Sequence, residues 1–330
     1  MKIAIVGCGA VGSYYGAKLG YSGQETHFLL RSDYEVVRRK GVLIRSAEGD
    51  FRFQPKCARQ PEEIGISDLV IIGLKTTAND QMGALLTPLI GPSTAILTLQ
   101  NGLGNEALLA GLFGAEKILG GLCFVCLNRL EPGVIHHIAH GTIIMGEYQR
   151  WPEPRTHDIA GLIRNSGVPC KVTDSLEGAH WEKLLWNIPF NGLGVAASAG
   201  YDAAAKGVLP AGLKPGPCLE SDRLLADPRW EQLARELMLE VIATANALGH
   251  KLPNPLVEKQ IIRTREMGTY KASTLLDFEQ GRSLELESLF LEPLRQARRA
   301  GVSTPRLAAL CRVLGALSEQ LATADKTFAA

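Results

Sequence analysis

Three polar side chains recur at every fourth position of one apolar segment: Lys183, Asn187 and Asn191. A helix would place them within an arc of about 80° on one side, because four residues make slightly more than one turn. Reduction of a ketone needs a proton donor for the developing alkoxide, and a partly desolvated lysine suits that task because burial lowers the pKa of a lysine. A surface lysine whose stem snorkels to water fits the same pattern. Pro189 is expected to kink or end this helix ahead of Asn191.

A glycine-rich segment near the N-terminus predicts a dinucleotide site. It follows a strand-like run, and its cofactor candidates are Gly7, Cys8, Gly9, Ala10, Val11 and Gly12. Gly7 suits a tight turn, Gly9 lets the backbone approach a pyrophosphate, and Gly12 allows close packing of helix on strand. The pyrophosphate would lie on the N–H groups that begin the helix. The alternative is a glycine-rich turn without a ligand.

The end of the second expected strand distinguishes NADPH from NADH. An NAD enzyme usually offers an acid to the ribose about twenty residues after the glycines. Here the strand ends in Arg31 and Ser32. Arg31 can hold a 2′-phosphate through a charge-assisted contact, with Ser32 as a further donor, so NADP(H) is the predicted cofactor. The alternative is a solvated Arg31, with Asp33 binding the ribose of NAD.

The first half of the chain alternates short apolar runs with helical stretches. The runs rich in Ile, Leu and Val are residues 2–6, 27–30, 69–74 and 95–99. This alternation predicts parallel strands covered on both faces, hence an α/β fold with a Rossmann-type doubly wound sheet. Further strand-like runs predict added antiparallel strands at 118–127, 133–138 and 142–146, with turns at 131–133 and 139–141.

From residue 174 onward the sequence is typical of helices. Residues 174–177 resemble a capping box, and apolar residues in 233–247 and 284–294 follow the helical period. We therefore expect an all-helical C-terminal domain. The predicted division is a NADP-binding Rossmann domain over residues 1–170 and a helical substrate and dimerisation domain over residues 171–330. The apolar stripe of 233–247 fits either the core of that domain or a homodimer interface. Residues 203–217 contain three glycines and three prolines, which predicts an irregular loop.

Composition excludes several classes of protein. The 330 residues carry a net charge of +1, with scattered Lys and Arg, so nucleic acid is not an expected partner. No segment approaches the roughly 18 apolar residues that span a bilayer, and no secretory signal precedes the glycines, so we expect a cytoplasmic protein without a membrane role. Cys123 and Cys126 lie in a strand-like run without a second ligand pair, which favours structural cysteines over a metal site.

The chain resembles the ketopantoate reductases (2-dehydropantoate 2-reductases) over nearly its whole length. Beyond the glycine-rich segment, the ordered motifs are Leu74-Lys75, Leu99-Gln100-Asn101-Gly102, the segment 181–187, and the segment 270–277 followed by Glu285. The resemblance implies a Rossmann domain joined to a helical domain. It also implies NADPH-dependent reduction of a 2-keto acid, ketopantoate, to pantoate in the cleft between them.

The resemblance also implies roles for particular residues. Lys183 would be the general acid, and Glu285 would orient the substrate. Asn187, Asn191, Ser273 and Asn101 would bind the substrate, and Asn101 and Lys75 would also contact the cofactor from strand ends. Each has an ordinary alternative: Glu285 suits the first turn of a helix, Ser273 a helix start, and Asn101 a turn.

Two departures from the family pattern concern the substrate pocket. Leu291 stands where the family commonly has a glycine, and the loop at 203–217 is long for the family. The first alternative is therefore a reductase of another branched 2-keto acid. A separate alternative is a non-catalytic NADPH-binding sensor that retains the fold.

Overall fold

The computed structural model describes residues 1–328, with side chains as far as residue 323, and divides the chain into two compact units. Unit 1 comprises residues 1–179, and unit 2 begins at residue 180. The division falls inside helix α7 (Leu176–Ala196), further along the chain than the boundary predicted at 170. Strand β10 (Cys170–Val172) still pairs with the sheet of unit 1, so the sheet outlasts the expected boundary.

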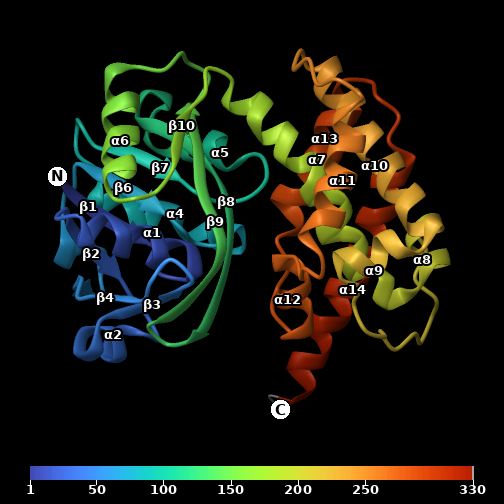
Figure 1. Ribbon diagram of the computed structural model, residues 1–330, viewed down its shortest axis with the longest axis horizontal. Coiled ribbons are helices and arrows are strands. Elements are labelled where there is room, and N and C mark those ends of the chain that lie inside the picture. The colour runs from blue at the N-terminus through green and yellow to red at the C-terminus, as the bar shows by residue number, and fades with distance from the viewer. Residues whose placement is uncertain (329–330) are drawn as a thin grey trace. The chain divides into compact units, whose positions relative to one another are not determined.

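Unit 1 is built on one mixed sheet (Figure 1), whose strand order is β4-β3-β9-β8-β7-β6-β1-β2-β5 with β10 beside β9. The remaining strands are β1 (Lys2–Val6), β2 (Glu25–Leu29), β3 (Val42–Ser46), β4 (Phe51–Phe53), β5 (Lys56–Ala58), β6 (Leu69–Ile72), β7 (Ala95–Thr98), β8 (Ile118–Glu131) and β9 (Val134–Glu147). Strands β7, β6, β1, β2 and β5 run parallel, as the alternating pattern predicts. The chain leaves β1 toward β2 on one side and reaches β6 on the other, so the strand order reverses at β1.

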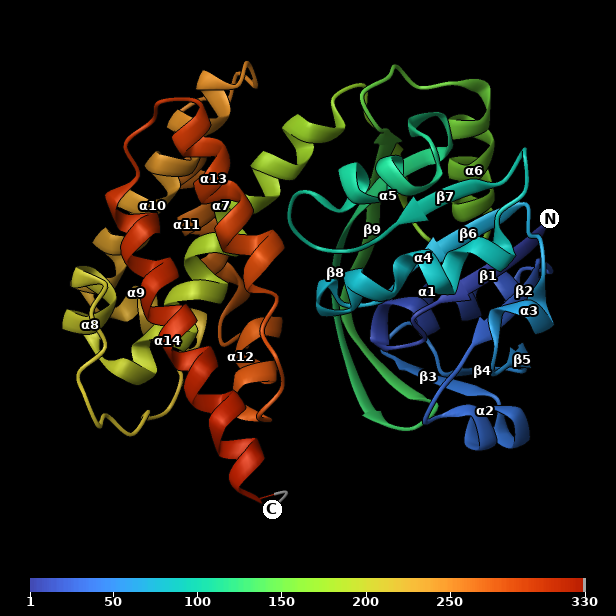
Figure 2. The ribbon, with the colours of Figure 1, turned by 180° about the vertical axis from the view of Figure 1, so that it is seen from behind.

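Helices cover both faces of this sheet. They are α1 (Ala10–Tyr21), α2 (Tyr34–Lys40), α3 (Pro61–Ile64), α4 (Met82–Leu86), α5 (Asn105–Phe113) and α6 (Pro154–Asn165). Ile3 and Ile5 of β1 pack with α1 and α6, whereas Ala4 and Val6 pack with α3, α4 and α5. Alternate side chains of a strand point to opposite faces, so a continuous apolar run is what a doubly covered strand requires. Figure 2 shows α4 and α5 on the near side of the sheet.

The added strands form a long antiparallel hairpin, β8 and β9. The turn predicted at 139–141 is wrong, because β9 runs through these residues. His140 instead adopts a φ of 66°, and the register between the two strands shifts beside it. The residues predicted to form a turn therefore form a β-bulge, and the two strands remain hydrogen-bonded on both sides of it. Strands β3, β4, β5 and β10 had no counterpart among the predicted strands.

The regular secondary structure of unit 2 is helical throughout its described residues. Its helices after α7 are α8 (Tyr201–Lys206), α9 (Ser221–Ala226), α10 (Pro228–Ala247), α11 (Leu256–Met267), α12 (Ser273–Glu279), α13 (Glu292–Arg299) and α14 (Pro305–Phe328). Helix α7 is buried along most of its length. A Cβ added at Gly192 would contact Leu310 of α14, and one at Gly194 would contact Leu275 of α12. The predicted Rossmann-type sheet and all-helical C-terminal domain are confirmed.

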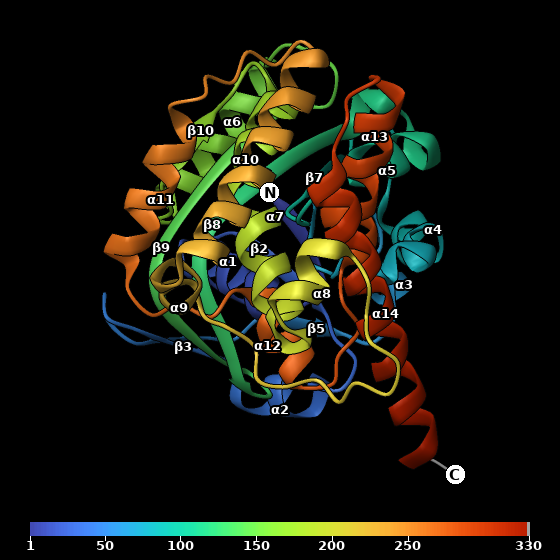
Figure 3. The ribbon, with the colours of Figure 1, turned by 90° about the vertical axis from the view of Figure 1, so that its right-hand side faces the viewer.

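Three local predictions for unit 2 are corrected. Pro189 does not end α7, which continues to Ala196. Residues 203–206 belong to α8, so the irregular loop covers 207–220 instead, where Figure 3 shows it running from α8 to α9. The segment 284–294 is not one regular α-helix, because Glu287–Leu291 forms a π-helical turn before α13. A π-helical turn contains one residue more between hydrogen-bonded positions than an α-helical turn, so the apolar period is interrupted here.

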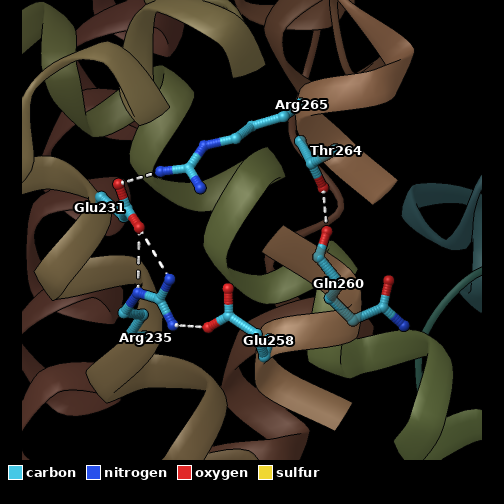
Figure 4. A network of polar contacts seen from close by, with 6 residues as sticks. All are labelled: Glu231, Arg235, Glu258, Gln260, Thr264 and Arg265. Carbon is cyan, nitrogen blue, oxygen red and sulfur yellow. Dashed lines mark hydrogen bonds and ion pairs between the residues drawn. The ribbon is translucent and has the colours of Figure 1, made fainter. Parts of the chain in front are cut away.

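The apolar stripe of 233–247 faces the core of unit 2. Leu237, Met238 and Val241 of α10 are buried there. Outside this core, charged side chains join α10 to α11 (Figure 4). Arg235 Nη2 donates to Glu231 Oε1 at 2.8 Å, its Nη1 donates to Glu258 Oε2 at 2.7 Å, and Arg265 reaches the other oxygen of Glu231. Over the described residues, no helix is long and apolar enough to cross a membrane.

Candidate functional site

The glycine-rich loop between β1 and α1 is shaped by close backbone packing. Gly7 has a φ of 95°, and a Cβ placed on it would lie 2.2 Å from the backbone nitrogen of Leu74. A Cβ on Gly12 would lie 2.2 Å from the carbonyl oxygen of Gly7. A Cβ on Gly9 would meet nothing within 4 Å. Two glycines therefore fit the loop to its neighbours, and the third leaves open space where α1 begins.

The other residues of this loop are half-buried. Ala10 and Val11 form the first turn of α1, and the Ser13 hydroxyl donates to the Cys8 carbonyl at 2.9 Å. Burial, with smaller contributions from Cys57 and Asp33, raises the pKa of the Cys8 thiol well above its usual range. The thiol is therefore protonated near neutral pH and is unsuited to act as a nucleophile.

The segment after β2 carries one exposed cation and one buried acid. The Arg31 side chain is exposed and has no hydrogen-bond or ion-pair partner among the described side chains. Asp33 is buried, accepts a hydrogen bond from the Ser32 hydroxyl at 2.9 Å, and forms an ion pair with Arg129 of β8. The predicted phosphate-binding residue is thus accessible, whereas the acid proposed as its alternative is already engaged.

The loops after β6 and β7 are joined by side-chain amides. Gln100 Nε2 donates to Asn79 Oδ1 at 2.9 Å, Asn79 Nδ2 donates to Asn105 Oδ1 at 3.0 Å, and Asn105 Nδ2 donates to the Asn101 carbonyl at 3.1 Å. Lys75 follows β6, and Asn101 follows β7. These strands are adjacent and parallel, so both predicted residues lie at the same edge of the sheet as the glycine-rich loop.

Helix α7 carries Lys183, Asn187 and Asn191 with the predicted four-residue spacing. Lys183 is half-buried, and both asparagines are buried. The intervening positions hold the helix in the core of unit 2, since Leu185 and Ile188 are fully buried and Trp186 Nε1 donates to Thr264 Oγ1 at 3.0 Å. The polar face of α7 is thus fixed by apolar packing around it.

The structure brings Asn191 together with the start of α12. Asn191 Oδ1 accepts a hydrogen bond from the Thr274 backbone N–H at 3.1 Å, and the Ser273 hydroxyl lies 3.5 Å from the same oxygen. The side chain of Asn191 thereby satisfies one of the unpaired N–H groups that begin a helix. Glu285 is buried just before the helical segment that contains the π turn, and its carbonyl accepts from the Leu289 N–H.

Several residues around these sites were not among the predicted site residues. Arg129 is 96 positions from its partner Asp33 and carries no local motif that would mark it. Asn79 and Asn105 belong to the amide network but not to any of the motifs identified in the sequence. Gln100 lies inside the Leu99–Gly102 motif, although its contact with Asn79 depends on the pairing of β6 with β7.

A doubly wound sheet whose glycine-rich loop lies where the strand order reverses, followed by a helical unit, has the architecture of a Rossmann-type dinucleotide-binding protein. The family model described as ketopantoate reductase PanE/ApbA matches residues 3–150, and that of its C-terminal domain matches residues 219–318. The chain belongs to the ketopantoate reductase family and is a nicotinamide-dependent oxidoreductase of that family.

Individual relatives support the same assignment. The chain is 35% identical to a 2-dehydropantoate 2-reductase from Nostoc sp., an alignment that covers 99% of this chain and 98% of the relative. It is 44% identical to the crystal structure of such an enzyme from Geobacter metallireducens, with a TM-score of 0.87 and coverage of 97% and 99%. The corresponding structure from Methylococcus capsulatus is 31% identical, with a TM-score of 0.84 and coverage of 97% and 98%. The resemblance seen in the sequence is confirmed.

Proposed function

We propose that this chain reduces 2-dehydropantoate to pantoate with NADPH, and that Lys183 is the general acid. The observation that carries the proposal is the placement of Lys183, Asn187 and Asn191 on one continuous helix that is fixed by core packing. The relatives from Nostoc and Geobacter are named for this reaction, which supports ketopantoate as the substrate.

The chain's own residues fit a dinucleotide that bears a 2′-phosphate. Open space beside Gly9 leaves room for a pyrophosphate at the start of α1, where backbone N–H groups are unpaired. Arg31 is exposed and has no partner among the described side chains, so its guanidinium can hold a phosphate through paired N–H donors. Asp33 is engaged by Arg129, which disfavours it as an acceptor for the ribose of NAD. When bound, the reduced nicotinamide supplies the hydride.

Lys183 performs the proton transfer in this proposal. As the keto carbon gains the hydride, its oxygen develops negative charge, and the Nζ of Lys183 donates the proton that completes the hydroxyl group. The substrate gains one hydride and one proton, which balances the change from 2-keto acid to 2-hydroxy acid. A positioned general acid contributes roughly 10²- to 10⁴-fold to such a step.

The remaining polar side chains hold the substrate and the cofactor. Asn187, Asn191 and Ser273 provide amide and hydroxyl groups for the carboxylate and hydroxyl of the substrate, and Glu285 orients it. Glu285 lies close in sequence to the π-helical turn, a distortion that is frequent at functional sites. We assign Asn101 to both substrate and cofactor, and Lys75 to the cofactor, because they follow β7 and β6 at the ligand-binding edge of the sheet.

The two parts of the chain have different roles in this proposal. Unit 1 would bind NADP, and unit 2 would bind substrate and form a homodimer, which keeps the roles predicted for residues 1–170 and 171–330 but moves the boundary into α7. Light scattering on the purified chain measures the oligomeric state. We also place the reaction in the cytoplasm, which fractionation of cells that express the chain would test.

Oxidation of NADPH in the presence of ketopantoate tests this function directly. The assay is run with NADPH and with NADH, and across a panel of 2-keto acids with branched, linear and aromatic side chains. We expect the highest kcat/KM for ketopantoate with NADPH. A higher value for another branched 2-keto acid would reassign the substrate while keeping the chemistry. Tight NADPH binding without turnover of any keto acid would overturn the enzymatic proposal in favour of a sensor.

A further inference from the structure

Asp33 and Arg129 form a two-point ion pair beside the glycine-rich loop. Arg129 Nε donates to Asp33 Oδ2 at 3.0 Å, and its Nη2 donates to Asp33 Oδ1 at 2.5 Å. The planar guanidinium therefore binds both carboxylate oxygens in parallel, which is the strongest geometry for such a pair. Because Arg129 lies on β8 and Asp33 follows β2, the pair links two parts of unit 1 that are distant in sequence.

The carboxylate of Asp33 does not cap helix α2. Asp33 is the residue that precedes α2, a position where an aspartate commonly accepts hydrogen bonds from the first N–H groups of the helix. No such side-chain hydrogen bond is present. The Asp33 oxygens instead accept from Arg129 and from the Ser32 hydroxyl. The geometry thus favours the ion pair over the helix cap.

The charge of Asp33 acts on the glycine-rich loop. It is one of the groups, after burial and Cys57, that raise the pKa of the Cys8 thiol within that loop. Asp33 also stands two residues after Arg31, the side chain proposed to hold the 2′-phosphate. An unpaired carboxylate at this position would repel a phosphate and would offer an acceptor to ribose hydroxyls.

Arg129 makes the net charge around Asp33 positive. Arg31, Asp33 and Arg129 together carry one net positive charge, whereas Arg31 and Asp33 alone carry none. Arg129 also occupies the oxygens of Asp33 that would otherwise accept from a ribose. The Asp33 side chain is only 9% exposed and that of Arg129 is 38% exposed, so the pair is partly shielded from solvent and less screened than an ion pair on the open surface.

We propose that Arg129 is a specificity-determining positioning residue, which neutralises Asp33 and thereby makes the segment after β2 select a 2′-phosphorylated nucleotide. This inference rests on the NADPH preference proposed above. It predicts that selectivity depends on the sum of the charges at positions 31, 33 and 129, and not only on Arg31.

The experiment measures binding of two adenosine fragments by titration calorimetry, without a keto acid or turnover. The probes are 2′,5′-ADP, which carries the 2′-phosphate, and 5′-AMP, which lacks it. The chains are the wild type, Arg129→Met, Asp33→Asn and the double variant. Lys171→Met serves as the control, because it removes one exposed positive charge from β10 of the same unit.

The proposal predicts a specific pattern of affinities. Arg129→Met should weaken 2′,5′-ADP binding by about tenfold or more, while 5′-AMP binding changes by less than about twofold, because the change in charge acts on the added phosphate. The double variant regains the net charge and should recover 2′,5′-ADP binding to within about threefold of wild type. Asp33→Asn alone raises the net charge of positions 31, 33 and 129 from +1 to +2 and should bind 2′,5′-ADP more tightly than wild type, while 5′-AMP binding is unchanged. Lys171→Met should match wild type.

Other outcomes overturn the proposal in distinguishable ways. If Arg129→Met keeps the wild-type ratio of the two affinities, or if the double variant is as weak as Arg129→Met, the pair has only a structural role. If Asp33→Asn weakens 5′-AMP binding, Asp33 binds ribose directly. If Arg129→Met does not fold, Asp33→Asn decides, because the proposal requires a higher affinity for 2′,5′-ADP relative to 5′-AMP, whereas a purely structural pair would leave that ratio unchanged. If the wild type does not prefer 2′,5′-ADP at all, the proposed NADPH preference itself fails.

Discussion

The glycine-rich loop of unit 1 and helix α7 of unit 2 are built in different ways. The loop is defined by backbone atoms, because Gly7 and Gly12 lie where any Cβ would overlap neighbouring main chain. Helix α7 is defined by side chains, because its polar face consists of Lys183, Asn187 and Asn191 and its other faces are packed in an apolar core. The loop thus depends on the absence of side chains at Gly7 and Gly12, whereas α7 depends on the chemistry of its polar side chains.

This difference separates the expected effects of substitution in the two regions. A larger residue at Gly7 or Gly12 should disturb folding and nucleotide binding together, because the same close contacts serve both. A substitution on the polar face of α7 should affect chemistry with little effect on folding, unless the side chain also holds another element.

Gly12→Ala should have the largest effect on stability. The new Cβ would lie 2.2 Å from the Gly7 carbonyl oxygen, so α1 must move away from β1. Overpacking of this kind costs about 1–3 kcal/mol or more. Urea unfolding measures the loss. Gly83→Ala in α4 is the matched control, because its Cβ meets open space, and it should be neutral or stabilising. Equal stability of Gly12→Ala and wild type would contradict the steric account of the loop.

Asn191→Ala should lower the stability of the fold as well as the activity. Its Oδ1 is buried and accepts from the Thr274 N–H, so removal leaves a buried donor unsatisfied at the start of α12. The expected loss of stability is about 1–3 kcal/mol. Asn191→Asp retains an acceptor oxygen and should recover part of it. If Asn191→Ala unfolds at the same urea concentration as wild type, the side chain serves the substrate alone.

Asn105→Ala should weaken nucleotide binding from outside the glycine-rich loop. Asn105 bridges Asn79 and the Asn101 carbonyl, and thus connects the loops that carry Lys75 and Asn101. Loss of one such bridge, at about 1 kcal/mol, corresponds to a roughly fivefold rise in the Kd for NADPH. Fluorescence titration measures it, with Asn165→Ala at the exposed end of α6 as control. An unchanged Kd would show that the amide network does not support the site.

Arg235→Met should have the smallest effect. Arg235 joins Glu231 to Glu258 at the surface of unit 2 (Figure 4), where solvent screens ion pairs. The Tm should fall by about 1–3 °C, and the difference from wild type should shrink in high salt. A large fall that is insensitive to salt would mean that the arginine stem, rather than its charge, stabilises the contact between α10 and α11.

Much of the fold could be predicted because periodicity reports burial. The apolar runs of β1, β6 and β7 are covered on both faces, and their alternation with helical stretches indicates a parallel sheet. Edge elements were missed for the same reason. Strand β5 is three residues long and begins with an exposed lysine, so it lacks an apolar run. The bulge at His140 reads as a turn, because local sequence does not show that both sides remain paired.

The site could be predicted where a motif is local and not where it depends on tertiary contacts. The spacing of Lys183, Asn187 and Asn191 needs only a helix, and that helix passes through Pro189 because surrounding packing outweighs the lost hydrogen bond. The contact of Asn191 with Thr274 joins residues 83 positions apart, and no spacing rule specifies it. The Asp33–Arg129 pair depends likewise on how β8 lies relative to β2.

Lys183→Met provides the most direct test of the central claim, that unit 1 holds the nucleotide and α7 supplies the proton. One preparation is used for both the Kd of NADPH and the turnover of ketopantoate, beside Glu182→Met as an exposed neighbour on the same helix. We predict a Kd within about twofold of wild type and a fall in turnover of roughly 10²- to 10⁴-fold, with Glu182→Met close to wild type. Turnover of Lys183→Met within a few-fold of wild type would contradict the account.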